Sequence, residues 1–192
     1  MGVREDAKRI WQQAIAAVQP DSAVRRALKT ADLTGKIHLV AIGKAAWSMA
    51  NAAYDALGEA ITDGVVVTKY DHSRGTIGNL QIFEAGHPVP DENSYRATRA
   101  AMELVKPLGK DDTVLFLVSG GGSALFECPL TEEAQMADIT KQLLASGADI
   151  VEMNTIRKRL SGVKGGKFAE LCAPAKVFSV VLSDIIGDPL DM

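Results

Sequence analysis

Val114-Leu115-Phe116-Leu117-Val118-Ser119-Gly120-Gly121-Gly122-Ser123-Ala124-Leu125 joins a continuous apolar run to three consecutive glycines. Such a run is typical of a strand that is buried on both faces of a parallel sheet. Glycines after the strand carry no Cβ, so an anion can approach the peptide amides closely. If a helix turn begins at Ser123, its unpaired N–H groups and dipole add to this attraction. The stretch therefore predicts a phosphate-binding loop, with a simple tight turn between strand and helix as the alternative.

The segments around this stretch alternate between strand-like and helix-like patterns. Expected strands are 37–42, 64–68, 80–84, 114–118 and 177–182, and expected helices are 45–57, 93–105, 131–145 and 150–160. Before them, residues 10–18 have helical spacing up to Pro20, and residues 24–28 suggest a second short helix. This alternation predicts an α/β fold with three layers, α/β/α, a mostly parallel, Rossmann-like sheet and a helical N-terminal segment.

Composition excludes some classes of protein. The chain has 192 residues, 47% of them hydrophobic, which is enough for a substantial core. Its formal charge of -3 shows no basic excess, so we expect no nucleic-acid partner. No apolar stretch reaches the roughly 18 residues that span a bilayer, so we expect no membrane partner and a cytoplasmic protein. The two cysteines, Cys128 and Cys172, have no metal-ligand spacing and are expected to be free thiols.

Three expected strands end in residues with distinctive chemistry. Gly43-Lys44-Ala45-Ala46 follows the first, the triple glycine follows the fourth, and Ser183 to Asp188 follows the last. Ligands of open α/β sheets bind beyond the carboxyl ends of the strands. The three segments are therefore expected to meet at one edge of the sheet.

Lys44 is the candidate cation at this edge. An ammonium group at a strand-to-helix junction can reach a phosphoryl group that helix-terminal amides also hold. A solvated lysine at a helix start is the alternative. The surrounding sequence is no Walker A loop, because His38 occupies the required upstream glycine position and Ala45 follows the lysine. A G-x-G-x-x-G fingerprint is also missing, which disfavours a nicotinamide cofactor.

Asp184 and Asp188 are the candidate metal ligands. One carboxylate could bind Mg²⁺ or accept a hydroxyl proton while the other supports it, although both could instead satisfy turn amides. Asn154 and Arg157 lie three residues apart on one side of an expected helix, where an amide and a guanidinium could hold a carboxylate. The histidines, His38, His72 and His87, are interpreted as structural.

Several motifs in order along the chain resemble the glycerate 2-kinase family, whose members are also labelled hydroxypyruvate reductases. These are Gly43-Lys44-Ala45-Ala46, Gly86-His87-Pro88-Val89-Pro90-Asp91, Ser119 to Leu125, Glu152-Met153-Asn154 with Arg157-Lys158, Leu160-Ser161 with Lys164-Gly165-Gly166, and Ser183-Asp184 with Gly187-Asp188. The likeness covers nearly the whole chain. It corresponds to the N-terminal, Rossmann-like domain of that family.

The resemblance implies ATP-dependent phosphorylation of D-glycerate at its 2-hydroxyl with a divalent metal, here Mg²⁺. It implies that Lys44 assists the transferring phosphoryl group and that Asp184 acts as base or metal partner. The loop residues Ser119, Gly120, Gly121, Gly122 and Ser123 would hold phosphate. Asn154, Arg157 and Lys164 would bind glycerate, and Asp188 would be the second metal residue.

Family members are longer, with a C-terminal domain that closes the cleft. We therefore expect residues 1–192 to be the N-terminal domain alone, and apolar surface left uncovered could make it self-associate. Two other functions stay open on this basis. One is a fragment that binds ligand without turnover, and the other is a hydroxypyruvate reductase.

Overall fold

Five parallel strands form the central layer of the structure, a computed structural model that describes residues 2–183 and 187 except for the side chain of residue 150. The strands are β1 (Lys36–Ile42), β2 (Ile61–Lys69), β3 (Gln81–Ala85), β4 (Asp112–Ser119) and β5 (Lys176–Leu182). Their order in the sheet is β3-β2-β1-β4-β5, and every neighbouring pair is parallel. The expected parallel sheet is confirmed.

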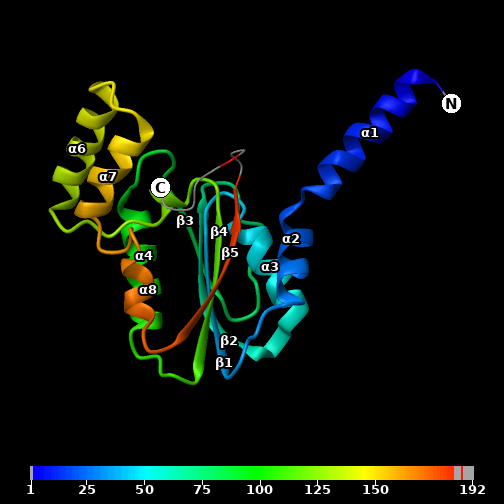
Figure 1. Cartoon of the computed structure of the whole chain (residues 1–192), viewed down its shortest axis with the longest axis horizontal. Coiled ribbons are helices and arrows are strands. Elements are labelled where there is room, and N and C mark those ends of the chain that lie inside the picture. The colour runs from blue at the N-terminus through cyan, green and yellow to red at the C-terminus, as the bar shows by residue number, and fades with distance from the viewer. Residues whose placement is uncertain (1, 184–186, 188–192) are drawn as a thin grey trace.

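Helices cover both faces of this sheet (Figure 1). They are α1 (Val3–Ala17), α2 (Pro20–Leu28), α3 (Ala46–Leu57), α4 (Glu92–Val105), α5 (Gly122–Leu125), α6 (Glu133–Ala145), α7 (Ile150–Leu160) and α8 (Lys167–Cys172), with a 3₁₀ turn, η1 (Gly58–Ala60), after α3. Figure 1 shows α2 and α3 on one side of the sheet and α4 and α8 on the other. The three-layer α/β/α fold is thus confirmed.

Each face of the sheet has its own hydrophobic core, as expected for strands that are apolar along their whole length. In β1, Leu39 and Ala41 pack in the core that contains α2 and α3, while Val40 and Ile42 pack in the core that contains α4 and α8. The second core includes three neighbouring aromatic rings, with Phe126 and Phe168 in a T-shaped pair at 5.0 Å between centroids. Burial on both faces holds β1 and β4 rigidly at the centre of the molecule.

The boundaries of several elements differ from those expected. The short helix expected at 24–28 begins at Pro20, because proline is well tolerated in the first turn of a helix. The strand expected at 64–68 extends from Ile61 to Lys69. Helix α8 was not expected, since its six residues are too few to show a clear helical period. Asp91 caps α4 as its sequence position suggests, by accepting a hydrogen bond of 3.0 Å from the amide of Ser94.

Helix α1 extends away from the sheet (Figure 1), and none of its residues is buried. Its apolar side chains include Trp11, which is 53% exposed, and Ile10, which is 65% exposed. The amphipathic pattern of the sequence therefore predicts the helix correctly, although the described residues provide no core for it. Self-association stays a prediction. Among the described residues, no helix is both long enough and apolar enough to cross a membrane.

Candidate functional site

The strand order reverses between β1 and β4, and the loops that follow these two strands are bonded to each other. The chain leads from β1 through α3 to β2 on one side, and from β4 to β5 on the other. The amide of Lys44 donates a hydrogen bond of 2.9 Å to the carbonyl of Gly120. The amide of Ala45 donates to the Ser119 hydroxyl at 3.0 Å. Such a reversal of strand order is where open α/β sheets bind ligands.

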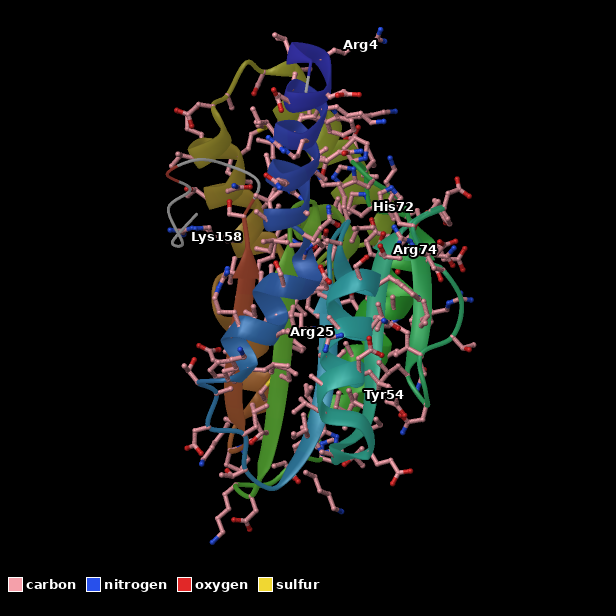
Figure 2. All side chains as sticks on the ribbon, turned by 90° about the vertical axis from the view of Figure 1, so that its right-hand side faces the viewer. Arg4, Arg25, Tyr54, His72, Arg74 and Lys158 are labelled. Atoms are coloured by element: carbon pink, nitrogen blue, oxygen red, sulfur yellow. The ribbon has the colours of Figure 1, made fainter. Side chains whose placement is uncertain are left out.

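The backbone of Lys44 is also held through its carbonyl oxygen. The Thr68 hydroxyl donates to this oxygen at 3.4 Å, and Nδ1 of His72 lies 3.0 Å from it. His72, labelled in Figure 2, therefore has the structural role expected from the sequence. Bonds from two neighbouring strand ends fix the position from which the Lys44 side chain starts, and such rigid support is what a functional cation needs.

Gly121 packs directly against Lys44 and His87. Its φ of +86° lies in the left-handed region, and an added Cβ would lie 3.2 Å from Cγ of Lys44. The same Cβ would lie 2.9 Å from the imidazole ring of His87. A side chain at this position would fill the space between the three residues, so both the conformation and the packing require glycine.

His87, which the sequence interpretation treats as structural, lies beside the glycine loop. It follows β3 after a single intervening residue, Gly86, and so lies at the same carboxyl edge of the sheet as Lys44. That position beyond a strand end was the signal that could have drawn attention to it. The His87 ring packs against Gly121, so it helps to shape the glycine loop, and a contact with ligand stays a prediction.

The glycine loop leads into a very short helix. Gly121 is the N-cap of α5, and its carbonyl accepts from the amides of Ala124 at 3.2 Å and Leu125 at 3.3 Å. Gly122 is buried and Ser123 is exposed at the start of this turn. A left-handed glycine followed by a helix turn is a backbone arrangement that directs consecutive amides toward an anion. The local geometry fits the expected phosphate-binding loop, whose ligand stays a prediction.

Arg157 reaches this loop from α7. Its Nη2 donates to the carbonyl of Ser123 at 3.1 Å, while its Nε is buried without a hydrogen-bond partner among the described residues. Asn154 lies one turn earlier on α7 and is half-buried. The structure therefore brings Arg157 to the glycine loop, where a glycerate contact by its guanidinium stays a prediction.

Lys164 makes contacts different from those that the resemblance implies. Its Nζ lies 2.8 Å from Oε2 of Glu127 and donates to the carbonyl of Phe126 at 2.7 Å. The Glu127 side chain is fully buried, and burial also lowers the pKa of Lys164 although Glu127 opposes this shift. The ammonium group thus anchors the segment after α5, and a glycerate contact by Lys164 stays a prediction.

Asp184 and Asp188, the predicted metal ligands, lie outside the described residues. Within residues 2–183 and 187 there is no group of three acidic, cysteine or histidine side chains that could hold a metal. A Mg²⁺ site at Asp184 and Asp188 stays a prediction.

A cavity of about 470 Å³ opens beside the Lys44–Gly120 contact. The ends of β1, β4 and β5 and the loops that follow them form one wall. The junction between α1 and α2 and one face of α2 form the other. The lining residues include Lys44, Ser119, Gly120 and Ser183 from the first wall, and Gln19 and Arg26 from the second. Its volume lies within the range of small-molecule sites, which is roughly 300–1,000 Å³.

A parallel sheet with helices on both faces, and with a cation, a glycine loop and a cavity at its switch point, defines a three-layer α/β domain of the Rossmann-like class. Residues 6–192 match the family described as "Domain of unknown function (DUF4147)". The chain belongs to this family, that of the glycerate kinases.

Two curated relatives and one solved structure show how close this relationship is. The chain is 57% identical to D-glycerate 2-kinase of Thermotoga maritima, over 95% of this chain and 44% of that protein. It is 40% identical to glycerate 2-kinase of Pyrococcus horikoshii, over 100% of this chain and 46% of that protein. The crystal structure of glycerate kinase from Thermotoga maritima has a TM-score of 0.92 over 96% of this chain and 45% of that structure, at 56% identity. The chain thus spans slightly less than half the length of the proteins it matches.

Proposed function

We propose that this chain takes part in the ATP-dependent phosphorylation of D-glycerate at its 2-hydroxyl, which produces 2-phosphoglycerate and ADP. The observation that carries the proposal is the contact of Lys44 with Gly120 and Gly121 at the switch point of the sheet. It occurs in a chain whose relatives are named glycerate kinases. Phosphoryl transfer depends mainly on positioning and on stabilising negative charge, and a fixed lysine beside a glycine loop can do both.

Each candidate residue has a defined role in this proposal. Lys44 stabilises the charge that develops on the transferring phosphoryl group, and the loop from Ser119 to Ser123 binds the phosphates. Arg157 and Asn154 hold the glycerate carboxylate, and the contact of Arg157 with Ser123 of the glycine loop supports this assignment. Asp184 acts as the base or as a ligand of Mg²⁺, with Asp188 beside it. A bound Mg²⁺ would neutralise phosphate charge.

Lys44→Ala tests the proposal in two measurements. Calorimetry with ATP and with D-glycerate reports binding, and an enzyme-coupled assay of ADP release reports turnover with Mg²⁺ present. We expect wild-type chain to bind both ligands and Lys44→Ala to lose turnover by at least about 100-fold, as is typical when a charge-stabilising donor is removed. The matched control is Lys110→Ala, because Lys110 is exposed and lies at the opposite, amino-terminal end of β4.

The same measurements separate the alternatives. Binding of both ligands without ADP release would indicate a chain that binds ligands but needs further residues for turnover. This second candidate function is considered because the chain spans only 44% of its Thermotoga relative. Oxidation of NADH by hydroxypyruvate, followed by absorbance, would instead indicate a reductase. If wild type releases ADP and Lys44→Ala releases it equally fast, Lys44 has no part in the mechanism.

A further inference from the structure

Arg26 is a second cation in the cavity beside Lys44. The two side chains reach the cavity from independent parts of the chain: Lys44 from the loop after β1, and Arg26 from the last turn of α2. Among the described lining residues there is no acidic side chain, and Arg26 has no ion-pair or hydrogen-bond partner in the described part of the chain. The described walls therefore carry two positive charges and no negative one.

The packing of α2 explains why Arg26 lines the cavity. Val24 is fully buried in the core between α2 and α3, and this fixes the rotation of the helix. Gln19, Ala23 and Arg26 follow one another at intervals of four and three residues, so they share one face of the helix. Arg25 points elsewhere, since its Nη2 lies 3.1 Å from Oδ2 of Asp55 on α3. The two neighbouring arginines thus have different surroundings.

We propose that Arg26 binds the polyphosphate chain of a nucleoside triphosphate in this cavity, opposite Lys44. The inference rests on the proposed phosphoryl-transfer function and adds a residue to its donor site. The α1–α2 segment then forms one wall of the nucleotide site. A planar guanidinium can donate two parallel hydrogen bonds to phosphate oxygens, and it stays charged at every physiological pH.

Polyphosphate fits the cavity better than the carboxylate of a small acid. Two cations, with no acidic side chain among the described lining residues, suit a ligand of several negative charges, whereas one carboxylate needs only one of them. The cavity volume of about 470 Å³ is also larger than a three-carbon acid requires and lies within the range of pockets for larger small molecules, roughly 300–1,000 Å³. Arg157, which contacts Ser123 and does not line this cavity, is the residue already proposed to bind the carboxylate.

The experiment compares Arg26→Gln with Arg25→Gln in the 192-residue chain. Both variants lose one positive charge from the last turn of α2, so both lose the same favourable interaction with the helix dipole. Only Arg26 lines the cavity; Arg25, labelled on α2 in Figure 2, pairs with Asp55. Affinities for sodium tripolyphosphate, ATP and D-glycerate are measured by calorimetry at low salt, where charge contacts are weakly screened.

We expect Arg26→Gln to bind tripolyphosphate and ATP about tenfold more weakly than wild type, which corresponds to one lost charge-assisted hydrogen bond. Arg25→Gln should keep wild-type affinity for both, and glycerate binding should be unchanged in both variants. Arg26→Lys keeps the charge and should retain part of the affinity. Thermal unfolding of all variants checks that the fold is intact, as expected for exposed side chains.

Three results would overturn the inference, and they separate it from the proposed function. If wild type binds ATP and tripolyphosphate and Arg26→Gln binds them equally well, Arg26 is no part of the site. If Arg26→Gln loses glycerate affinity alone, Arg26 binds the carboxylate. If wild type binds neither ATP nor tripolyphosphate, the inference and the proposed function both fail for this chain.

Discussion

The amide of Lys44 is bonded to the carbonyl of Gly120, so the loop after β1 and the loop after β4 form one unit. The two residues are 76 positions apart in the chain, as their numbers show, yet the parallel pairing of β1 and β4 brings them together. Movement of one loop must therefore displace the other. A change in the glycine loop is consequently expected to affect the cation at the end of β1.

Gly121→Ala is expected to weaken ATP binding and to destabilise the fold. Alanine at φ +86° costs about 1–2 kcal/mol in backbone strain. The new methyl group would also press on His87 and Lys44, with distances of 2.9 and 3.2 Å. Urea unfolding measures the change in stability, and calorimetry measures ATP affinity.

Gly166→Ala is the matched control for this prediction. Its φ of +88° imposes nearly the same backbone strain, but an added Cβ at Gly166 meets no atom within 4 Å. Gly166→Ala should therefore lose stability and keep its ATP affinity. Equal ATP affinity in both variants would show that the packing of Gly121 against Lys44 does not matter for the ligand.

Arg157→Ala is expected to weaken glycerate binding by about 2 kcal/mol, the value of a two-point contact with a carboxylate. ATP binding should be spared, because Arg157 contacts the carbonyl of Ser123, the last residue of the loop, and does not line the cavity beside Lys44. Calorimetry with each ligand measures the two effects. Arg159→Ala, which removes an exposed cation of the same helix, should bind both ligands as wild type does. Equal losses for both ligands in Arg157→Ala would contradict the assignment.

Lys164→Met is expected to lower the free energy of unfolding by about 3–5 kcal/mol, since it leaves the carboxylate of Glu127 buried without a counter-charge. Adding Glu127→Leu should restore most of this stability, because the pair is then replaced by apolar groups. Urea unfolding measures both changes.

An exposed ion pair provides the control for this prediction. Arg99 and Glu133 lie 2.9 Å apart, nearly as close as the buried pair, but their side chains are 53% and 43% exposed. Arg99→Met should therefore cost no more than about 1 kcal/mol. If Lys164→Met costs equally little, the Glu127 carboxylate must be hydrated or protonated in the folded chain.

The two thiols are expected to react at very different rates. Burial raises the pKa of Cys172 to about 11, so almost no thiolate forms at pH 8. Burial also raises the pKa of Cys128, but this residue is only half-buried, whereas Cys172 is buried. An aromatic disulfide reagent at pH 8 should modify one thiol in the native chain and two after unfolding in urea. Cys128→Ser should remove the native reaction and Cys172→Ser should retain it.

The raised pKa of Cys172 also has a consequence for stability. Because the unfolded thiol ionises near pH 8.5–9 and the folded one near 11, the folded chain holds this proton more tightly. The free energy of unfolding that the protonated Cys172 thiol contributes is fully present below about pH 8.5. This contribution is lost as the pH rises through 11. Wild type should therefore lose stability over this range faster than Cys172→Ser. Parallel curves for the two proteins would show that Cys172 titrates normally.

Much of the fold follows directly from local patterns in the chain. The continuous apolar run at 114–118 requires burial on both faces, and this alone implies helices on both sides of a parallel sheet. Lys44 and the triple glycine each follow a predicted strand closely. Both are therefore placed at the edge of the sheet where the carboxyl ends of the strands lie. These features could be predicted because strand and helix periods depend on neighbouring residues.

The partners of the site residues could not be predicted in this way. Nothing in the local pattern distinguishes Arg26 from Arg25, and only the burial of Val24 against α3 directs one to the cavity and the other to Asp55. Lys164 likewise belongs to a cationic segment in sequence, but the fold pairs it with Glu127. The contact of His87 with Gly121 depends on strand order. The sequence by itself determined the layers, the parallel strands and the edge that carries the loops, because these depend on local periodicity. Only the tertiary structure decided which charges meet, because that depends on how distant segments pack.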